Sequence, residues 1–278
     1  KLFTACNTKV KEGMVVTTDS EKVIASRKAA LNLILANHNQ DCFSCPSNGV
    51  CELQKVCNEY GVYRSTMEPN NRNFRGEEKN AHPFLGYRPD LCIRCQRCVN
   101  TCAKVSGRNS IELKKDGIHT IIDVPFGEDW KATTCESCGN CAEACPTGAL
   151  YKKEAKSFRE FEVERVRTTC PHCAVGCQYD VLVKDNKVLG TEAADGESNH
   201  GRMCVKGRFG SYKFVMAGDR ITDPLIKDRE TGKFRKASWD EALDLVASRF
   251  MQIKKQYGPD ALAGFACSRS PNEDIYMV

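Results

Sequence analysis

The stretches CIRCQRCVNTC (92–102) and CESCGNCAEACP (135–146) decide the fold, because both have the spacing C-x2-C-x2-C-x3-C. A [4Fe-4S] cluster needs three thiolates from one tight loop and a fourth from elsewhere, and where two such runs occur together the fourth cysteine of each ligates the other cluster. The spacing therefore predicts two ligand sets: Cys92, Cys95, Cys98 and Cys145 for one cluster, and Cys135, Cys138, Cys141 and Cys102 for the other. Two zinc ribbons, the alternative, would show paired C-x2-C knuckles instead of two runs of four.

The wider composition agrees with metal-bound thiolates. The chain has 18 cysteines among 278 residues, mostly in tight groups, and it starts KLFTAC without a charged-then-apolar leader. We therefore expect a reducing, cytoplasmic location in place of a secreted disulfide scaffold. No apolar run approaches the roughly 18 residues that a membrane helix needs, so no membrane span is expected.

The net charge gives little support to a nucleic-acid partner. The formal value of +5 counts every cysteine as neutral. About fifteen thiolate ligands and four cubane cores of about +2 each would bring the net charge to about −2. The basic balance then disappears, and no nucleic-acid partner is expected.

A third cysteine group stands at CPHCAVGC (170–177), and a further cysteine follows 27 residues later. The intervening stretch YDVLVKDNKVLGTEAA (179–194) alternates apolar and polar residues around Asp185 and Asn186. This pattern predicts a hairpin that returns the distant cysteine to the first three. The predicted ligands of one more [4Fe-4S] cluster are Cys170, Cys173, Cys177 and Cys204.

Together with the tail CVKGRFG (204–210), this segment resembles the iron–sulfur domain at the start of molybdenum or tungsten bis-pterin oxidoreductases, formate dehydrogenases above all. In that family the lysine just after the last cysteine lies between the cluster and the pterin. The resemblance makes Lys206 the candidate cofactor-binding residue and electron relay, and an ordinary solvated lysine is the alternative. No acid–base pair or nucleophile stands out in the chain, so catalytic residues stay unassigned.

A fourth group combines one histidine with three cysteines in the spacing H-x3-C-x2-C-x5-C: His38, Cys42, Cys45 and Cys51. An amphipathic helix is expected just before it, over 21–36, with its apolar residues on one face. Three thiolates from one loop need a fourth partner. Both His38 and Cys57 are candidates, and local geometry does not separate them.

The stretch GVCELQ (49–54) distinguishes the two candidates by resemblance. It is similar to the His(Cys)3 domain of the large iron–sulfur subunit of respiratory complex I, which many iron-only hydrogenases and NAD-linked formate dehydrogenases share. The resemblance implies that His38 is the fourth ligand of a [4Fe-4S] cluster and that Cys57 is a buried free thiol.

The first residues also carry a resemblance. The stretch TACNTKVKEGM (4–14) is similar to the end of a plant-type [2Fe-2S] domain, in which its cysteine is the last of four ligands. Cys6 is therefore expected to share a [2Fe-2S] cluster with an upstream domain. A plain buried cysteine is the alternative.

The last residues predict the beginning of an α/β domain. SWDE (238–241) is a capping box that opens a helix to about Tyr257, and 261–266 is expected to form a short buried strand. SPNE (270–273) then opens a second helix with proline at its first position. Cys267, just after the strand, is interpreted as a structural core thiol.

These motifs predict an α+β, multi-domain iron–sulfur protein. A hairpin is expected over 114–126, turning at Asp116 and Gly117. Four histidines are interpreted as structural or surface residues: His82, His119, His172 and His200. The predicted parts are the end of a [2Fe-2S] domain (1–20), a His(Cys)3 [4Fe-4S] domain (21–62), a linker (63–80), a two-cluster ferredoxin-like domain (81–152), a charged connector (153–164), a bis-pterin-type [4Fe-4S] domain (165–222) and the start of a molybdopterin oxidoreductase catalytic domain (223–278).

The resemblance implies the electron-transfer portion of a formate dehydrogenase or CO2 reductase. Electrons from a molybdenum or tungsten bis-molybdopterin guanine dinucleotide would pass Lys206, four [4Fe-4S] clusters and the [2Fe-2S] centre, and reach a flavin/NAD(P)-binding subunit or ferredoxin. The expected partners are such flavin and iron–sulfur subunits, with formate or CO2 as substrate. The alternatives are a complex I-like subunit, an iron-only hydrogenase subunit and a stand-alone electron-transfer module. Two intact four-cysteine runs (92–102 and 135–146) argue against a complex I-like subunit, and the CVKGRFG tail argues against an iron-only hydrogenase subunit.

Overall fold

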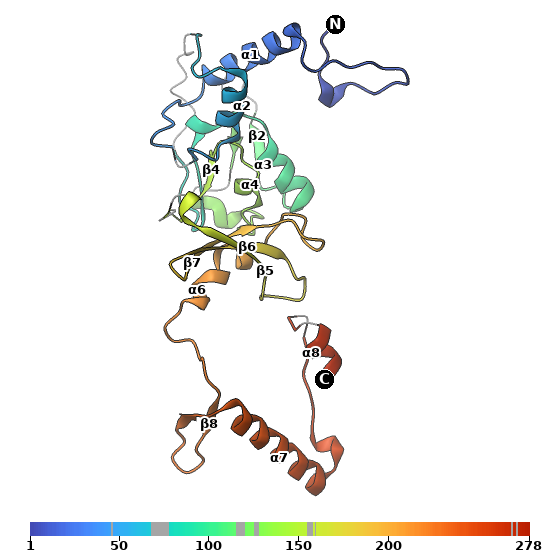
Figure 1. Ribbon diagram of the computed structural model, residues 1–278, viewed down its shortest axis with the longest axis vertical. Helices are drawn as coiled ribbons and strands as arrows, with labels where there is room; N and C mark the ends of the chain where they lie inside the picture. Colours follow the sequence, from blue (N-terminus) through green and yellow to red (C-terminus); the bar gives the residue numbers. More distant parts are fainter. Residues whose placement is uncertain are drawn as a thin grey trace. The chain divides into compact units, whose positions relative to one another are not determined.

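The computed structural model describes residues 1–45, 47–67, 78–114, 120–124, 128–154, 158, 160–267, 269–270 and 272–278. The chain divides into two compact units, Lys1–Ala155 and Lys156–Val278, and Figure 1 labels many of their helices and strands. Among the described residues, none of the helices combines the length and the apolar character needed to cross a bilayer.

The first unit begins with two helices joined by the loop that carries the His38 group. Ser20 caps the first helix, because its Oγ accepts a hydrogen bond from the backbone N–H of Val23 at 3.4 Å. The second helix ends at Gly61, whose φ of 64° is the left-handed conformation of a common helix C-terminus. The helices are α1 (Glu21–Leu35) and α2 (Glu52–Tyr60), so the helix predicted over 21–36 is confirmed to within one residue.

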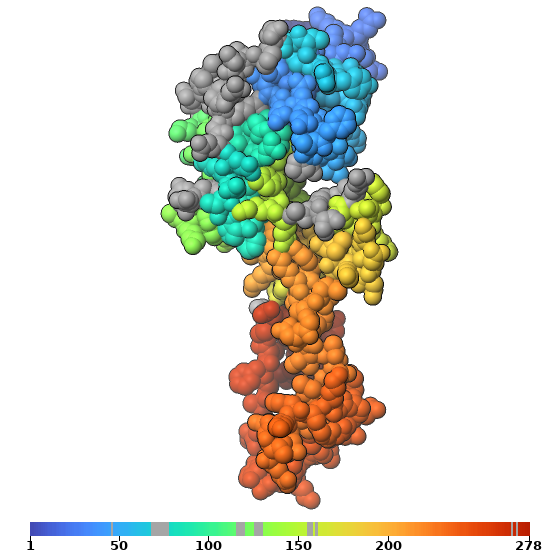
Figure 2. All heavy atoms as spheres, turned by 90° about the vertical axis from the view of Figure 1, so that its left-hand side faces the viewer, coloured from blue at the N-terminus to red at the C-terminus, as the bar shows by residue number. Residues whose placement is uncertain are grey.

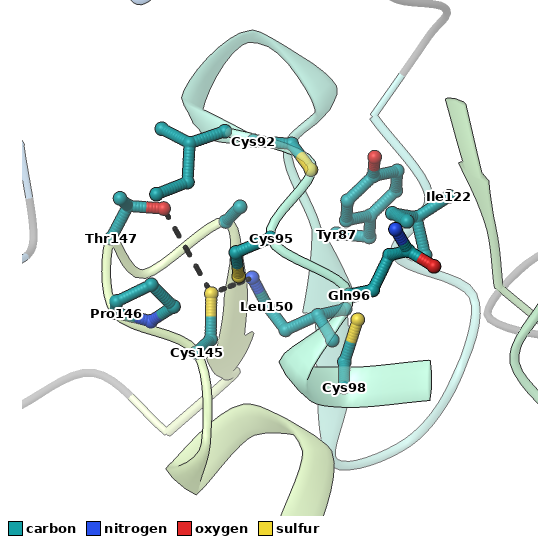
Figure 3. Close-up of a pocket in the computed structure, with 12 residues that line it drawn as sticks. Tyr87, Cys92, Cys95, Gln96, Cys98, Ile122, Cys145, Pro146, Thr147 and Leu150 are labelled. Carbon is teal, nitrogen blue, oxygen red and sulfur yellow. Dashed lines mark hydrogen bonds between the residues drawn. The ribbon is translucent and has the colours of Figure 1, made fainter. Parts of the chain in front are cut away.

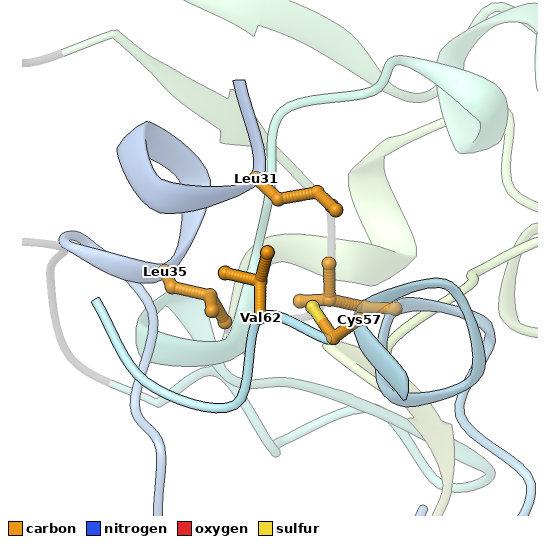
Figure 4. Close-up of a cluster of buried hydrophobic side chains, with 5 residues drawn as sticks. Leu31, Leu35, Cys57 and Val62 are labelled. Atoms are coloured by element: carbon orange, nitrogen blue, oxygen red, sulfur yellow. The ribbon is translucent and has the colours of Figure 1, made fainter. Parts of the chain in front are cut away.

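An apolar cluster holds α1 and α2 together. Figure 4 shows side chains from both helices and from the segment after α2 meeting in it. Its buried members are Leu31, Leu35, Leu53, Cys57 and Val62. Ile93, from the first four-cysteine run, packs against the same cluster, so the helix pair and that run share one core.

In the sequence, the two four-cysteine runs lie between the first and last strands of the ferredoxin-like part. These strands pair antiparallel, with Leu85 opposite Lys152 and Tyr87 opposite Leu150, so residues far apart in sequence close the unit. A second antiparallel pair confirms the hairpin predicted over 114–126, although its turn at Asp116–Gly117 lies outside the described residues. The elements are η1 (Ala5–Asn7), β1 (Leu85–Tyr87), η2 (Pro89–Leu91), α3 (Arg97–Asn100), the π-helical turn η3 (Thr101–Val105), β2 (Glu112–Lys114), β3 (Ile121–Asp123), η5 (Glu128–Ala132), α4 (Asn140–Glu143) and β4 (Leu150–Lys152).

The second unit is built on a three-stranded antiparallel sheet in the order β5-β6-β7. Asp185 and Asn186 form its tight turn with φ values of 50° and 58°, which confirms the predicted hairpin. Strand β5, which precedes the hairpin, was not predicted. Its residues ERVRTT are all exposed, so the stretch has no buried face and resembles a charged connector. The elements are η6 (Glu160–Glu162), β5 (Glu164–Thr169), β6 (Gln178–Lys184), β7 (Lys187–Ala193), α5 (Val205–Phe209) and α6 (Ser211–Val215).

The last part of the second unit confirms the two predicted helices, α7 and α8, and contradicts two other predictions. Ser238 Oγ accepts a hydrogen bond from the N–H of Glu241 at 3.1 Å and opens the predicted helix α7. The buried strand predicted over 261–266 is wrong: within the described residues this stretch has no strand partner, and Phe265 is 97% exposed. Cys267 is exposed as well, so it is not a core thiol. The elements are β8 (Leu225–Lys227), β9 (Phe234–Lys236), α7 (Trp239–Tyr257), η7 (Pro259–Ala261) and α8 (Asn272–Met277).

Candidate metal centres

Four thiols of the first predicted ligand set line one cavity between β1, β4 and the start of α3 (Figure 3). Backbone amides point at two of them: the N–H of Arg94 donates to Cys92 Sγ and the N–H of Leu150 donates to Cys145 Sγ, both at 3.4 Å. Amide hydrogen bonds to cysteine sulfur are a common way for proteins to stabilise iron–sulfur ligands. The thiols that line the cavity are Cys92, Cys95, Cys98 and Cys145.

Burial governs the protonation of Cys98. Desolvation, followed by repulsion from the neighbouring Cys145 and Cys92 sulfurs, raises the pKa of Cys98 to about 12. The bare Cys98 thiol therefore holds its proton at neutral pH. An iron core bound here would displace that proton, and its positive charge would stabilise the thiolate.

The second predicted ligand set is also brought together. Burial raises the pKa of Cys141 well above its ordinary value, and the sulfurs of Cys138, Cys135 and Cys102 raise it further. The amide of Ser137 donates to Cys135 Sγ at 3.5 Å. The Cys98 sulfur also contributes to the pKa of Cys141, so the two candidate centres are neighbours.

The loops of the two four-cysteine runs share an unusual backbone conformation. In each loop two residues adopt positive φ: Arg94 and Gln96 at 60° and 61°, and Ser137 and Gly139 at 58° and 76°. These left-handed residues turn the chain so that successive thiols face one cavity, and a short helix begins directly after each second position. Three of the four positions carry side chains that disfavour this conformation, which indicates that the tertiary structure maintains it.

The His38 group lines a second cavity of the first unit. Burial raises the pKa of Cys51, and the nearby sulfurs of Cys45 and Cys42 raise it further. Cys57 lines the same cavity while its side chain packs in the apolar cluster of α1 and α2, buried as predicted. The structure therefore places both candidate fourth ligands, His38 and Cys57, at the cavity, and like the spacing it does not choose between them.

A junction connects this cavity to the cavity lined by Cys92, Cys95, Cys98 and Cys145. Cys51 Sγ lies 3.5 Å from the carbonyl oxygen of Pro146, the residue after Cys145, and that oxygen also accepts the N–H of Glu52 at 3.0 Å. Thr147, 1% exposed, lines both cavities. Figure 2 shows the blue atoms of the N-terminal helices packed against the teal atoms of the ferredoxin-like part. Sequence reasoning missed this junction, because no pattern in the chain pairs GVCELQ with CPTG.

The cysteines of the second unit also gather. Burial raises the pKa of Cys177, and the sulfurs of Cys170, Cys173 and Cys204 raise it further. The first three lie in the connection between β5 and β6, which the hydrogen bond from the N–H of Cys170 to the carbonyl of Cys177 closes at 2.8 Å. Cys204 directly precedes α5.

Asn199 brings Cys204 back to the other three thiols. Its Oδ1 accepts the N–H of Gln178 at 3.0 Å, and its Nδ2 lies within 2.9–3.1 Å of three carbonyl oxygens, those of Gln178, Ala194 and Arg202. This buried amide joins the end of β7 and the start of β6 to the segment before α5. The sequence offered no signal for it beyond an asparagine in a loop.

Lys206 and Cys6 lie at less enclosed positions. Lys206 is an exposed residue of α5 near the ring of His172, whose pKa is lowered first by burial and then by the charges of Arg269 and Lys206. Cys6 is exposed in η1, so the alternative that it is a buried cysteine is wrong. Its role in a [2Fe-2S] cluster stays a prediction.

The donor sets have the chemistry that a cubane requires. Among the residues described here, no set of three or more His, Cys, Asp or Glu side chains converges closely enough to hold a single metal ion. A [4Fe-4S] core is larger than one ion, and its ligands surround it instead of meeting at one point. One cavity is lined by four thiols and the other by four thiols and the His38 imidazole, and both donor sets suit such a core.

Four family descriptions match successive stretches of the chain. Residues 27–66 match the NADH-ubiquinone oxidoreductase-G iron-sulfur binding region, and residues 83–151 match the ferredoxin-like domain of NADH-quinone oxidoreductase subunit 3. Residues 163–215 match the molybdopterin oxidoreductase Fe4S4 domain, and residues 220–278 match molybdopterin oxidoreductase.

Curated relatives match nearly the whole chain. The chain is 37% identical over 276 residues to the NADPH-Fe(3+) oxidoreductase subunit alpha of Geobacter sulfurreducens, covering 99% of this chain and 31% of that protein. It is 32% identical over 323 residues to a protein of Staphylococcus haemolyticus named "Putative formate dehydrogenase", covering 100% of this chain and 32% of that protein. The chain thus spans about a third of the length of these relatives.

Among solved structures, an NAD+-reducing [NiFe]-hydrogenase in the H2-reduced state is similar in fold. The TM-score is 0.50 at 24% identity, over 55% of this chain and 65% of that chain. Together with the mixture of helices and strands, the family matches confirm the predicted α+β, multi-domain iron–sulfur architecture. The chain is a multi-domain iron–sulfur protein in which complex I-like iron–sulfur domains precede molybdopterin oxidoreductase domains.

Proposed function

We propose that this chain is the electron-transfer portion of a molybdopterin oxidoreductase whose substrate is formate or CO2. The observation that carries the electron-transfer role is the contact between Cys51 Sγ and the Pro146 carbonyl, which joins two candidate centres through one residue next to a ligand. The neighbouring pair Cys98 and Cys141 extends the series to a third centre. Three neighbouring candidate centres within one unit support the transfer of electrons over distance.

The residues of the chain would hold four [4Fe-4S] clusters, each of which accepts and releases a single electron. Burial of Cys98, Cys102, Cys141 and Cys170 excludes water from these four ligands. The backbone amides of Arg94, Ser137 and Leu150 place partial positive charge at ligand sulfurs. For the fourth ligand of the Cys51 centre, we propose His38. The full proposed ligand list is His38, Cys42, Cys45, Cys51, Cys92, Cys95, Cys98, Cys145, Cys135, Cys138, Cys141, Cys102, Cys170, Cys173, Cys177 and Cys204.

Formate as the substrate is supported by the combination of domains. In this chain a molybdopterin oxidoreductase match follows two iron–sulfur region matches, and the whole chain aligns with staphylococcal proteins named "Putative formate dehydrogenase". In this proposal Lys206 lies between the Cys170 centre and the pterin, and the metal is molybdenum or tungsten. Cys6 would contribute to a [2Fe-2S] centre, and a cytoplasmic flavin/NAD(P) subunit or ferredoxin would exchange electrons with it.

A second candidate is an NADPH-linked Fe(3+) reductase. It is favoured by the identity of 37% to the Geobacter protein, which exceeds the 32% to the staphylococcal one. In this case electrons would enter from NADPH, and formate would have no effect on the iron–sulfur centres. The two candidates therefore differ in the donor that reduces the same set of sites.

The donor can be tested on the full-length, anaerobically purified enzyme with its partner subunits. Formate alone and NADPH alone are added in separate samples, and the reduced cluster signals are recorded by electron paramagnetic resonance (EPR). Reduction by formate supports the first candidate. Reduction by NADPH with no response to formate overturns it in favour of the second.

A further inference from the structure

His82 is a fully buried histidine beside the Cys135 loop, and it belongs to none of the ligand sets. Its exposed fraction is 0%, and its ring lies against Trp130 with a centroid separation of 4.5 Å. It precedes β1, whereas the cysteines of the second four-cysteine run follow more than 50 residues later. The fold therefore places a polar ring from a distant segment directly beside a predicted ligand loop.

The hydrogen bonds of the ring fix its tautomer. His82 Nδ1 accepts the backbone N–H groups of both Phe84 and Leu85, each at 3.1 Å. An atom that accepts two N–H groups cannot carry a proton of its own, so the proton of the neutral ring is on Nε2. The backbone before β1 thus orients the imidazole and leaves Nε2 as a donor.

The donor nitrogen faces the Cys135 loop. Nε2 lies 3.1 Å from Ser137 Oγ and 4.0 Å from Cys135 Sγ. The same sulfur accepts the amide of Ser137 at 3.5 Å. The positive end of the Nε2–H dipole is therefore directed to the edge of the site where a ligand sulfur lies.

We propose that His82 is a positioning residue that raises the reduction potential of the cluster held by Cys135, Cys138, Cys141 and Cys102. Reduction adds negative charge that is shared with the thiolates, and a buried N–H group whose nitrogen lies 4.0 Å from Cys135 Sγ stabilises the reduced form. Water cannot replace this dipole, because the ring is fully buried. The inference rests on the proposed function, since it requires a [4Fe-4S] cluster at this site.

Two substitutions test the direction of the effect. His82→Asn keeps an acceptor oxygen that can bond the amides two and three residues on, but it lacks the distal N–H donor. Ser137→Ala removes the oxygen that competes with Cys135 Sγ for the same proton, so the sulfur no longer shares the N–H with that oxygen. The two variants should therefore shift the potential in opposite directions.

The experiment is an EPR-monitored redox titration of the anaerobically purified full-length enzyme and of both variants. His82→Asn should make one cluster about tenfold harder to reduce, a negative shift of about 59 mV for a one-electron couple, with the other signals unchanged. Ser137→Ala should shift the same signal positively, and it keeps the test valid if His82→Asn does not accumulate. Unchanged midpoints in both variants, or shifts of the same sign, would overturn the proposal. If the parent enzyme showed no [4Fe-4S] signals, the function proposed above would fail instead.

Discussion

Cys51 Sγ lies 3.5 Å from the carbonyl oxygen of Pro146, although the two residues are 95 positions apart in sequence. The carbonyl is held by the N–H of Glu52 at 3.0 Å, and the Glu52 carboxylate pairs with Arg97 of α3 at 2.6 Å. Two cysteine loops from different parts of the chain are therefore joined by a backbone hydrogen bond and an exposed ion pair. Exposed ion pairs stabilise little, so the backbone bond is the stronger candidate for holding the junction.

Glu52→Pro removes that hydrogen bond together with the ion pair to Arg97, while the backbone can keep its conformation. Residue 52 is the first residue of α2, where proline is favoured, and Cys51 has ψ 122°, which suits a residue before proline. The Pro146 carbonyl should lose a bond of about 1 kcal/mol and move away from Cys51. We expect a weaker magnetic interaction between the two reduced clusters, measured as a smaller splitting of their EPR lines.

Glu52→Ala is the matched control for this prediction. It abolishes the ion pair with Arg97 but keeps the backbone N–H at position 52. Its EPR splitting should resemble that of the parent enzyme. Equal losses in the alanine and proline variants would show that the ion pair, not the amide, maintains the junction.

The left-handed positions in the loops of the two four-cysteine runs predict that equivalent substitutions in the two loops will change stability by different amounts. Gly139 has φ 76° and Gln96, at the equivalent position of the first loop, has φ 61°. Gly139→Gln should cost about 1–2 kcal/mol, because a side chain is disfavoured at positive φ. Gln96→Gly relieves the same strain, although it adds entropy to the unfolded chain, so it should cost less than the first variant.

The asymmetry can be measured as the temperature at which the anaerobic enzyme loses its cluster absorbance. A difference of 1 kcal/mol corresponds to about 2–4 °C in a unit of this size. Gly139→Gln should lower that temperature more than Gln96→Gly does. A larger loss for Gln96→Gly would mean that the Gln96 side chain itself holds the loop.

How much of this architecture the sequence could predict depends on the range of the interactions. Local signals worked: Ser20 and Ser238 cap the predicted helices, and Asp185 with Asn186 forms the predicted turn. Cysteine spacing also sufficed to predict which thiols gather, because three of each set come from one loop. The strand predicted over 261–266 failed because an apolar run forms a strand only where another strand pairs with it.

Contacts between distant segments left no trace in the sequence. The junction at Pro146, the donor nitrogen of His82 and the two hydrogen bonds between Asn199 and Gln178 each join residues that are 21 to 95 positions apart. A single proline, histidine or asparagine fits many environments, so none of them stood out among the residues of its loop. Only the folded backbone shows which carbonyl or thiol each one contacts.

Asn199 should be required for the cluster of the second unit. Asn199→Ala removes the acceptor for the N–H of Gln178 and the donor to three carbonyl oxygens, at a cost of about 3 kcal/mol if two or three buried groups lose their partners. The segment that carries Cys204 should then detach from the other ligands. We expect about four fewer iron atoms per chain than in the parent, measured by iron analysis of the anaerobic enzyme.

Asn199→Asp serves as the control, because it keeps the oxygen that accepts the N–H of Gln178 but loses the donors. Its iron content should fall between those of the parent and the alanine variant. The EPR signals of the first unit should stay unchanged in both variants. Unchanged iron in Asn199→Ala would contradict the role assigned to this amide.

The fourth ligand of the Cys51 centre can be decided by a pair of substitutions, since both His38 and Cys57 line its cavity. Replacing His38 with Ala removes the proposed imidazole ligand, so one EPR signal should change or vanish while the others persist. Cys57→Ala removes a thiol that is 6% exposed within the apolar cluster of α1 and α2, and it should cost about 1 kcal/mol through the small cavity it leaves, with no change in any signal. The reverse result, a lost signal in Cys57→Ala and none in His38→Ala, would make Cys57 the ligand and His38 a bystander at the cavity wall.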